Sequence, residues 1–423
     1  MPWPLRGPNS RSDHVRKPSI SSLRHEAGLA LVESAVAELL GTDGIPTGPG
    51  GVALLAQLSR AYFFTDNQVR AIEVADRALE AGERLDLAEI VSDTLITRGS
   101  ALCHLGRGYE GLGAIRAGIE LADERGLVST ALRGRLNMGV LAADPRTSYE
   151  AAEAALEIAR RFGLRGFVRT LVANSASAAL EVGEWDRAIR AIAAARDESA
   201  DVLESNHLGW VLFTFSSDRG EDVTAELARL TAWAESIGES GAMDAIQDLL
   251  GEFHFGSGAF VQACDEWLMF GPSDPLNAPI AYFNAGIAAL LAGDLERATT
   301  VLARLAGLPA RGRWRALNLR LLQAGVAGLE GRTTEAVREA RAVLGEYERL
   351  GLPWRQALGG LVLASVVGVG DSYVLEMAAT SREIFSRLGA QPFLEYLEAA
   401  VAQTVEPVGR RARRDVPASA PTS

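Results

Sequence analysis

Five polar residues have types and spacings that suit the recognition of another molecule. An asparagine recurs two positions before a small residue in three apolar, helix-like stretches, as Asn137, Asn174 and Asn284. An amide donates and accepts hydrogen bonds at once, which suits the backbone of an extended peptide. Arg133 and Arg169 stand about one helical turn before the first two, and a guanidinium group can hold a carboxylate. These five residues are the candidate partner-binding site, although the amides could instead bond a neighbouring helix or water.

Other reactive constellations are missing from the sequence. Lys17 is the only lysine, and no GxxxxGK[ST] loop occurs, so neither a P-loop nucleotide site nor a Schiff-base lysine in a structured region is expected. The five histidines form no pair at helical i, i+3 or i+4 spacing, and adjacent Cys103 and His104 point to different helix faces. No GxSxG or HExxH motif is present. We therefore expect no catalytic residue, no metal, no cofactor and no enzymatic activity.

Charge and hydropathy narrow the class of partner. The formal net charge is −12, and both ends are basic, so the long middle of the chain is more acidic still. Such a surface does not suit nucleic acid. The basic run Arg410–Arg414 is interpreted as a solvated end, with contact to nucleic acid or acidic lipid as the alternative.

The longest uncharged apolar run, Leu358–Gly370, is too short to span a bilayer. Only two cysteines, far apart, favour a reducing compartment, so we expect a cytoplasmic protein.

A repeating pattern orders most of the chain. A small residue is followed seven positions later by a Gly or Asp turn and five positions after that by Ala or Gly, which predicts helix A, a tight turn and helix B. Antiparallel helices approach to about 8–10 Å, and small side chains suit their crossing point, so Gly99 should face Gly111, and Gly286 should face Ala298. The helix A positions recur every 35 to 40 residues: Ser59, Gly99, Gly139, Ala176, Phe213, Gly251, Gly286 and Ala324.

This spacing resembles that of tetratricopeptide repeats, with a longer period of about 38. Residues 54–106 resemble the C-terminal repeat region of bacterial adenylate/guanylate cyclases that also carry an ATPase domain, and of LuxR-type regulators. The resemblance covers residues 23–404 and implies an all-α, right-handed α-solenoid of antiparallel hairpins. It also implies that the asparagine position faces a concave groove that holds a partner's backbone. The cyclase and ATPase parts themselves are missing.

The resulting domain prediction has three segments. Residues 1–22 and the basic tail 405–423 are expected to be disordered, and residues 23–404 form eight to nine hairpins with a last hairpin over Trp354–Leu388 and a capping helix over Pro392–Gln403. Phe213, beside Trp210, breaks the small-residue rule, as a superhelix irregularity or a partner pocket.

The function we expect is that of a non-catalytic protein-interaction or regulatory scaffold that binds a protein or peptide. The alternatives are a detached sensor part of a cyclase or ATPase signalling protein, and a small-molecule sensor. A hydrolase or transferase on a helical toroid is a further class, for which the sequence offers no candidate residues.

Overall fold

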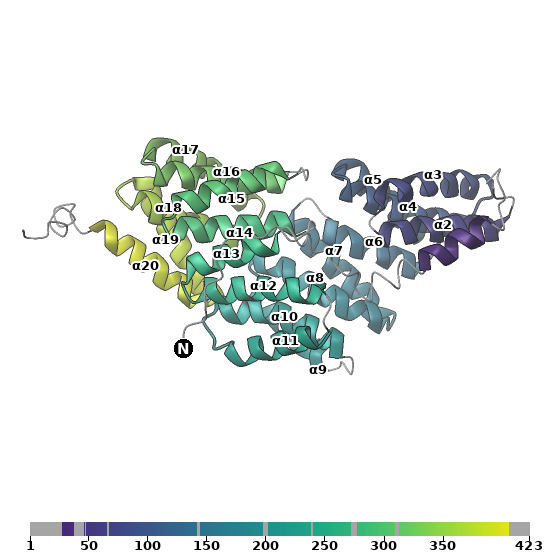
Figure 1. Cartoon of the computed structure of the whole chain (residues 1–423), viewed down its shortest axis with the longest axis horizontal. Helices are drawn as coiled ribbons and strands as arrows, with labels where there is room; N and C mark the ends of the chain where they lie inside the picture. The colour runs from purple at the N-terminus through teal and green to yellow at the C-terminus, as the bar shows by residue number, and fades with distance from the viewer. Residues whose placement is uncertain are drawn as a thin grey trace, which may run out of the picture.

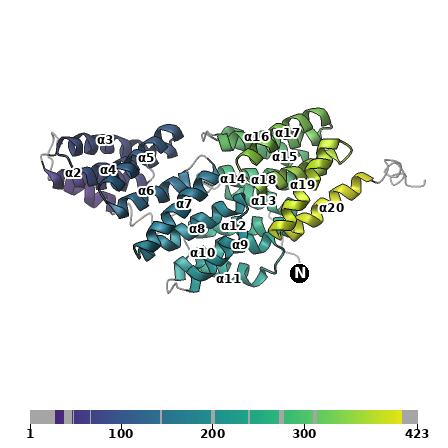
Figure 2. The same ribbon diagram turned by 180° about the vertical axis from the view of Figure 1, so that it is seen from behind.

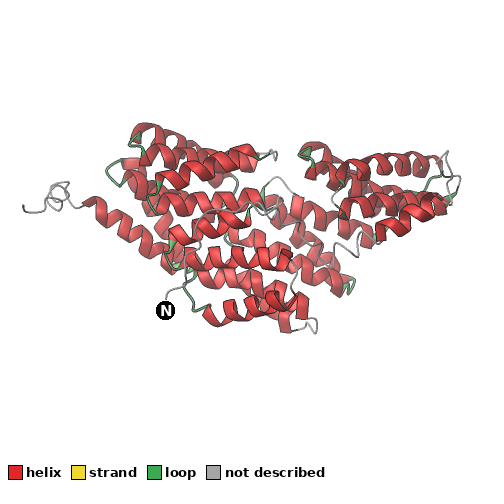
Figure 3. Cartoon of the chain, in the orientation of Figure 1, coloured by secondary structure: helices red, strands yellow, loops and turns green. Residues whose placement is uncertain are grey.

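The computed structural model describes residues 28–37, 46, 48–65, 67–141, 144–197, 202–237, 240–271, 277–308 and 313–405. These residues form helices joined by short turns and no strand (Figure 3). The predicted segment 1–22, the basic run Arg410–Arg414 and nearly all of the predicted tail lie outside the described residues.

The helices alternate between the A and B roles that the repeat predicts. The A helices are α2 (Pro49–Phe64), α4 (Ala88–His104), α6 (Val128–Leu141), α8 (Arg165–Val182), α10 (Val202–Asp218), α12 (Ser240–Gly256), α14 (Ala278–Leu291), α16 (Arg313–Leu329) and α18 (Pro353–Val367). The B helices are α3 (Gln68–Arg84), α5 (Gly108–Glu124), α7 (Pro145–Arg161), α9 (Trp185–Asp197), α11 (Thr224–Ile237), α13 (Phe260–Phe270), α15 (Leu295–Gly307), α17 (Thr333–Arg349) and α19 (Ser372–Leu388). The final described helix is α20 (Gln391–Val405). All eight predicted helix A positions fall on A helices, so the predicted solenoid of antiparallel hairpins is confirmed.

The crossing of α4 and α5 shows why glycine is needed at the small positions. A Cβ added to Gly99 would lie 2.6 Å from the carbonyl oxygen of Gly111 and 2.7 Å from the Cγ1 of Ile115. Both distances are well inside van der Waals contact, so the two backbones approach as closely as their glycines permit. The predicted pairing of Gly99 with Gly111 is confirmed.

Two other crossings differ from the simple pattern. The nearest atoms to a Cβ at Gly286 belong to Leu322 of α16, the next A helix, rather than to Ala298 of its own hairpin. The missing side chain at Gly286 therefore makes room for Leu322 of the next repeat. Phe213 is buried in a separate cluster with Val223, Leu230 and Leu249, and α10 packs less extensively against α11 than α4 does against α5.

The chain divides into an arm and a body. Helices α2–α6 extend as an arm, whereas α7–α20 wind into a compact body whose C-terminal helices return to earlier repeats (Figures 1 and 2). In the body α18 contacts α8 and α14, and α20 contacts α10. One hydrophobic core runs from Leu132 to Leu397, and a smaller one lies beneath α2–α4.

Turn glycines mark the seam where the C-terminal helices meet earlier repeats. Gly183, Gly220 and Gly258 end α8, α10 and α12 with φ of +77°, a left-handed conformation that glycine adopts without strain. A Cβ at Gly183 would lie 2.9 Å from the Cγ of Pro353, at the start of α18. Gly220 meets Pro392 in the same way, at 3.0 Å. These glycines therefore serve both the turn and the seam.

Aromatic side chains fill the space behind this seam. Trp185, at the start of α9, contacts Trp354 edge to face with ring centroids 5.0 Å apart. Trp354 also contacts Phe393 of α20, again at 5.0 Å. Trp185 and Trp267 are almost fully buried, so both serve as packing residues.

Candidate functional site

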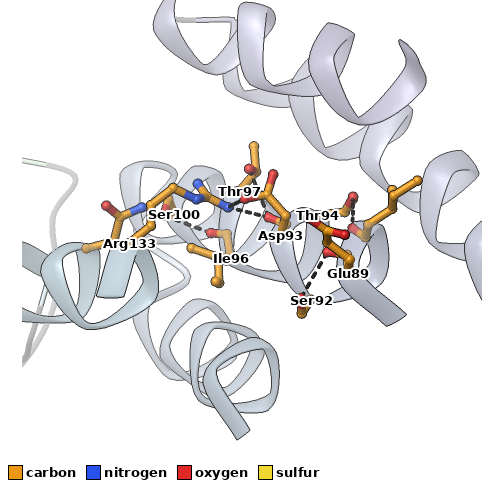
Figure 4. A network of polar contacts seen from close by, with 10 residues as sticks. Glu89, Ser92, Asp93, Thr94, Ile96, Thr97, Ser100 and Arg133 are labelled. Atoms are coloured by element: carbon orange, nitrogen blue, oxygen red, sulfur yellow. Dashed lines mark hydrogen bonds and ion pairs between the residues drawn. The ribbon is translucent and has the colours of Figure 1, made fainter. Parts of the chain in front are cut away.

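An ion pair joins two neighbouring A helices of the arm. Nη2 of Arg133, on α6, lies 2.8 Å from Oδ1 of Asp93 on α4 and also donates to the backbone carbonyl of Asp93. Figure 4 shows this guanidinium reaching across to α4. Burial lowers the pKa of Arg133, Asp93 raises it, and neighbouring Arg60 lowers it again. Arg133 is therefore paired with Asp93, and Arg60 is a second positive charge close enough to act on it.

A row of hydroxyl groups on α4 lies beside this pair. Thr94 donates to the carbonyl of Ile90 at 2.6 Å, Thr97 to that of Asp93 at 3.2 Å, and Ser100 to that of Ile96 at 2.8 Å (Figure 4). Each hydroxyl satisfies a helix carbonyl and keeps acceptor capacity on its oxygen. Thr94, Thr97 and Ser100 are all buried, so these hydroxyls lie within the packing around α4.

Asn137 uses one of these acceptors. Its Nδ2 donates to the Oγ of Ser100 at 2.9 Å, so the predicted recognition residue is held in place by the neighbouring helix. Its amide oxygen accepts no hydrogen bond from any residue in the described part of the chain. The side chain is half-buried, which leaves that oxygen as an oriented acceptor.

Asn174 and Arg169 lie on the next A helix of the series, α8. Both residues are half-buried. The Nδ2 of Asn174 is enclosed and has no hydrogen-bond partner among the described residues. A buried amide without a partner costs about 1–3 kcal/mol, and because this donor is enclosed, a partner's acceptor can reach it only if neighbouring side chains move. Because α6 contacts both α4 and α8, four of the five predicted site residues belong to consecutive A helices.

The fifth predicted residue, Asn284, has a different environment. Its Oδ1 accepts a hydrogen bond of 3.2 Å from Nη1 of Arg355, on α18. Arg355 is almost fully buried; its Nε donates to Oε2 of Glu181 at 2.7 Å and its Nη2 donates to Oε1. The same guanidinium lies 4.5 Å from the ring centroid of Phe283. Asn284 thus belongs to a buried network that ties α8, α14 and α18 together, and this use could not be read from helical spacing.

Two further carboxyl groups adjoin that network. Burial raises the pKa of Asp218 well above its usual range, and Glu181 adds to the rise while Arg355 opposes it. Burial likewise raises the pKa of Glu252, together with the nearby charge of Asp218. One arginine therefore faces several acids, and Asp218 and Glu252 are held in their neutral form at higher pH than free carboxyl groups are.

The other candidate groups for chemistry are inert in their settings. Burial raises the pKa of the Cys103 thiol to about 11 and that of the Cys264 thiol to about 12, so both remain protonated at neutral pH. Among the described residues, no three or more His, Cys, Asp or Glu side chains are grouped to hold a metal ion. Within that same part of the chain, no helix combines the length and apolar character needed to cross a membrane.

No protein-family model matches the chain, and no curated protein does. Among solved structures, the apo form of the quorum sensor NprR from B. thuringiensis aligns over 91% of this chain and 98% of its own, with 14% identity and a TM-score of 0.37. The yeast Tom70 aligns over 90% of this chain and 85% of its own, with 13% identity and a TM-score of 0.34. These identities and TM-scores are too low to assign a fold or a function to the chain.

Proposed function

We propose that the protein is a non-catalytic interaction scaffold that holds an extended segment of a partner protein along the inner faces of α4, α6 and α8. The residues that would bind the segment are Arg133, Asn137, Arg169 and Asn174. Asn284 is not part of this proposed site, because its amide oxygen already accepts a hydrogen bond from Arg355 of the same chain. The partner remains a protein or peptide.

The observation that carries this proposal is the contrast between the two asparagine environments. In the body, the amide oxygen of Asn284 already accepts a hydrogen bond from Arg355, which belongs to a buried intramolecular network. In the arm and at its junction with the body, Asn137 retains an oriented acceptor and Asn174 an enclosed donor without a partner. An acceptor and a donor on neighbouring helices suit the N–H and C=O groups of an extended peptide backbone.

The positive charge at Arg133 suggests which charge the partner segment carries. Arg133 pairs with the carboxylate of Asp93, and the positive charge of Arg60 acts on the same guanidinium. A carboxylate on the partner, from an acidic side chain or a chain end, would balance this excess. We therefore propose that the bound segment carries at least one negative charge near α6.

The experiment begins with affinity capture of the intact protein from its host lysate, with mass spectrometry of bound proteins and small molecules. The dissociation constant of each captured protein is then measured for the unmodified chain and for Asn137→Ala combined with Asn174→Ala. Two peptide hydrogen bonds contribute about 1–3 kcal/mol together, so the double variant should bind about 5- to 150-fold more weakly. Gln262→Ala, on the exposed side of α13, is the control and should bind normally.

Three outcomes are informative. An unchanged dissociation constant in a folded double variant would exclude the inner face as the binding site. A captured cyclase or ATPase would support the more specific hypothesis, drawn from residues 54–106, of a separately encoded sensor part of such a protein. A stoichiometric small molecule without any protein would overturn the scaffold proposal in favour of a ligand sensor.

A further inference from the structure

An open pocket of about 400 Å³, called the cavity below, lies where the C-terminal hairpin meets the α7–α8 hairpin. Its walls come from the first turn of α7, the end of α8, the turn between α17 and α18, and one face of α19. Arg146 and Gly351 join two of these walls, since Nη2 of Arg146 donates to the carbonyl oxygen of Gly351 at 2.7 Å. Small-molecule sites typically have volumes of roughly 300–1,000 Å³. The cavity is thus of ligand size and spans segments about 200 residues apart in the chain.

Charges of both signs line this volume. Arg146 and Arg387 supply two guanidinium groups, and Glu348 and Glu383 supply two carboxylates. Within the described chain, the side chains of Glu348, Glu383 and Arg387 form no hydrogen bond or ion pair with one another or with any other residue. They are exposed, so water now solvates charges that a ligand could pair.

The start of α18 adds a preference for negative charge. Pro353 occupies the first turn, and Leu352 at the N-cap provides no side-chain cap. The N–H groups of a first helical turn lack partners within the helix, and the helix dipole favours an anion there. Leu352, Pro353 and Gln356 all line the cavity, so this helix start faces the same space as the arginines.

The lining selects against ligands that carry a single charge. A simple anion such as phosphate would pair with the arginines but would be repelled by the two carboxylates, whereas a simple cation would be repelled by the two guanidinium groups. Only a ligand with both charges satisfies both sets. Val182 and Ile384 are largely buried and contribute a small apolar surface, which suits an aliphatic side chain.

We propose that this cavity binds a free amino acid with an aliphatic side chain. The carboxylate would pair with Arg387 and Arg146 beside the start of α18, and the ammonium with Glu383 and Glu348. Because the walls belong to separate parts of the superhelix, the bound ligand stabilises the contact between α7–α8 and α17–α19. This site is distinct from the proposed partner face and does not depend on it.

The test uses the full chain and L-leucine, with binding measured by calorimetry and by the shift of the melting temperature. N-acetyl-L-leucine lacks the ammonium, and L-leucine methyl ester lacks the carboxylate; both should bind at least about tenfold more weakly, which corresponds to one lost charge pair. Arg387→Gln should weaken L-leucine about tenfold or more and leave the methyl ester unchanged. Glu383→Gln should weaken L-leucine and leave the N-acetyl derivative unchanged.

Arg382→Gln provides the matched control. Arg382 lies on the same helix but pairs with Glu398, with Nε 2.6 Å from Oε1, and does not line the cavity; its substitution should leave L-leucine binding unchanged. The proposal is overturned if L-leucine and the other aliphatic amino acids neither bind nor raise the melting temperature. It is overturned equally if inorganic phosphate binds as tightly as L-leucine, because the cavity would then be an anion site.

Discussion

Replacing Gly99 by alanine tests the close crossing of α4 and α5. The new Cβ would lie 2.6 Å from the Gly111 carbonyl oxygen, 2.7 Å from Ile115 Cγ1 and 3.0 Å from the Ile115 backbone nitrogen. Two of these three atoms belong to the backbone, so rotation of a side chain cannot relieve the overlap and the helices must move apart. Overpacking of this kind costs about 1–3 kcal/mol, and the higher helix propensity of alanine returns about 1 kcal/mol. We expect a net loss of up to about 2 kcal/mol in the free energy of unfolding.

Gly139→Ala is the internal control, because it occupies the equivalent position of the next hairpin. The nearest atom to a Cβ there is the Ser148 carbonyl oxygen, at 3.6 Å, which is ordinary contact. Alanine should therefore stabilise α6 by about 0.4–1 kcal/mol. Urea unfolding followed by circular dichroism, with hydrogen exchange to localise the change to α4 and α5, measures both variants. A Gly99→Ala protein as stable as Gly139→Ala would refute the packing argument.

Two further predictions concern the buried network. Arg355→Met leaves Glu181 buried without a counter-ion and should cost about 3–5 kcal/mol in urea unfolding; the double variant Glu181→Met with Arg355→Met should recover most of the loss, and no recovery would mean that the pair is not coupled. The raised pKa values of Asp218 and Glu252 mean that the folded state holds more protons than the unfolded state above about pH 4. Their contribution to stability is therefore complete below that pH and is lost as pH rises towards the folded-state values. Asp218→Asn with Glu252→Gln should flatten the fall in melting temperature as pH rises above about 4, and a parallel fall in the variant would contradict the assignment.

The local plan of the fold could be predicted from the sequence because it depends on neighbouring residues. Small residues at the repeat positions indicate where two helices cross, as at Gly99 and Gly111. The turn glycines report where a left-handed residue ends a helix, as at Gly183. Both signals act within about 40 residues, the length of one hairpin, so periodicity reveals them.

The closure of the body could not be predicted in this way. Glu181 and Arg355 are 174 residues apart, and nothing in the repeat period shows that α18 meets α8. For the same reason, Asn284 has the sequence context of Asn137 and Asn174 but a different environment. The cavity beside Arg146 was also missed, since its charged residues come from separate hairpins and form no motif.

The seam at Gly183, Gly220 and Gly258 has a consequence for how the chain matures during synthesis. An open solenoid can complete each repeat as soon as the next one leaves the ribosome, since its contacts are local. Here the surfaces around these glycines and Trp185 are covered by α18 and α20. Those two helices are synthesised later, so the surfaces stay uncovered until then. The nascent body must therefore carry exposed aromatic surface until its C-terminal helices emerge. Chaperone binding, or aggregation of stalled chains, is expected to concentrate at this stage of translation.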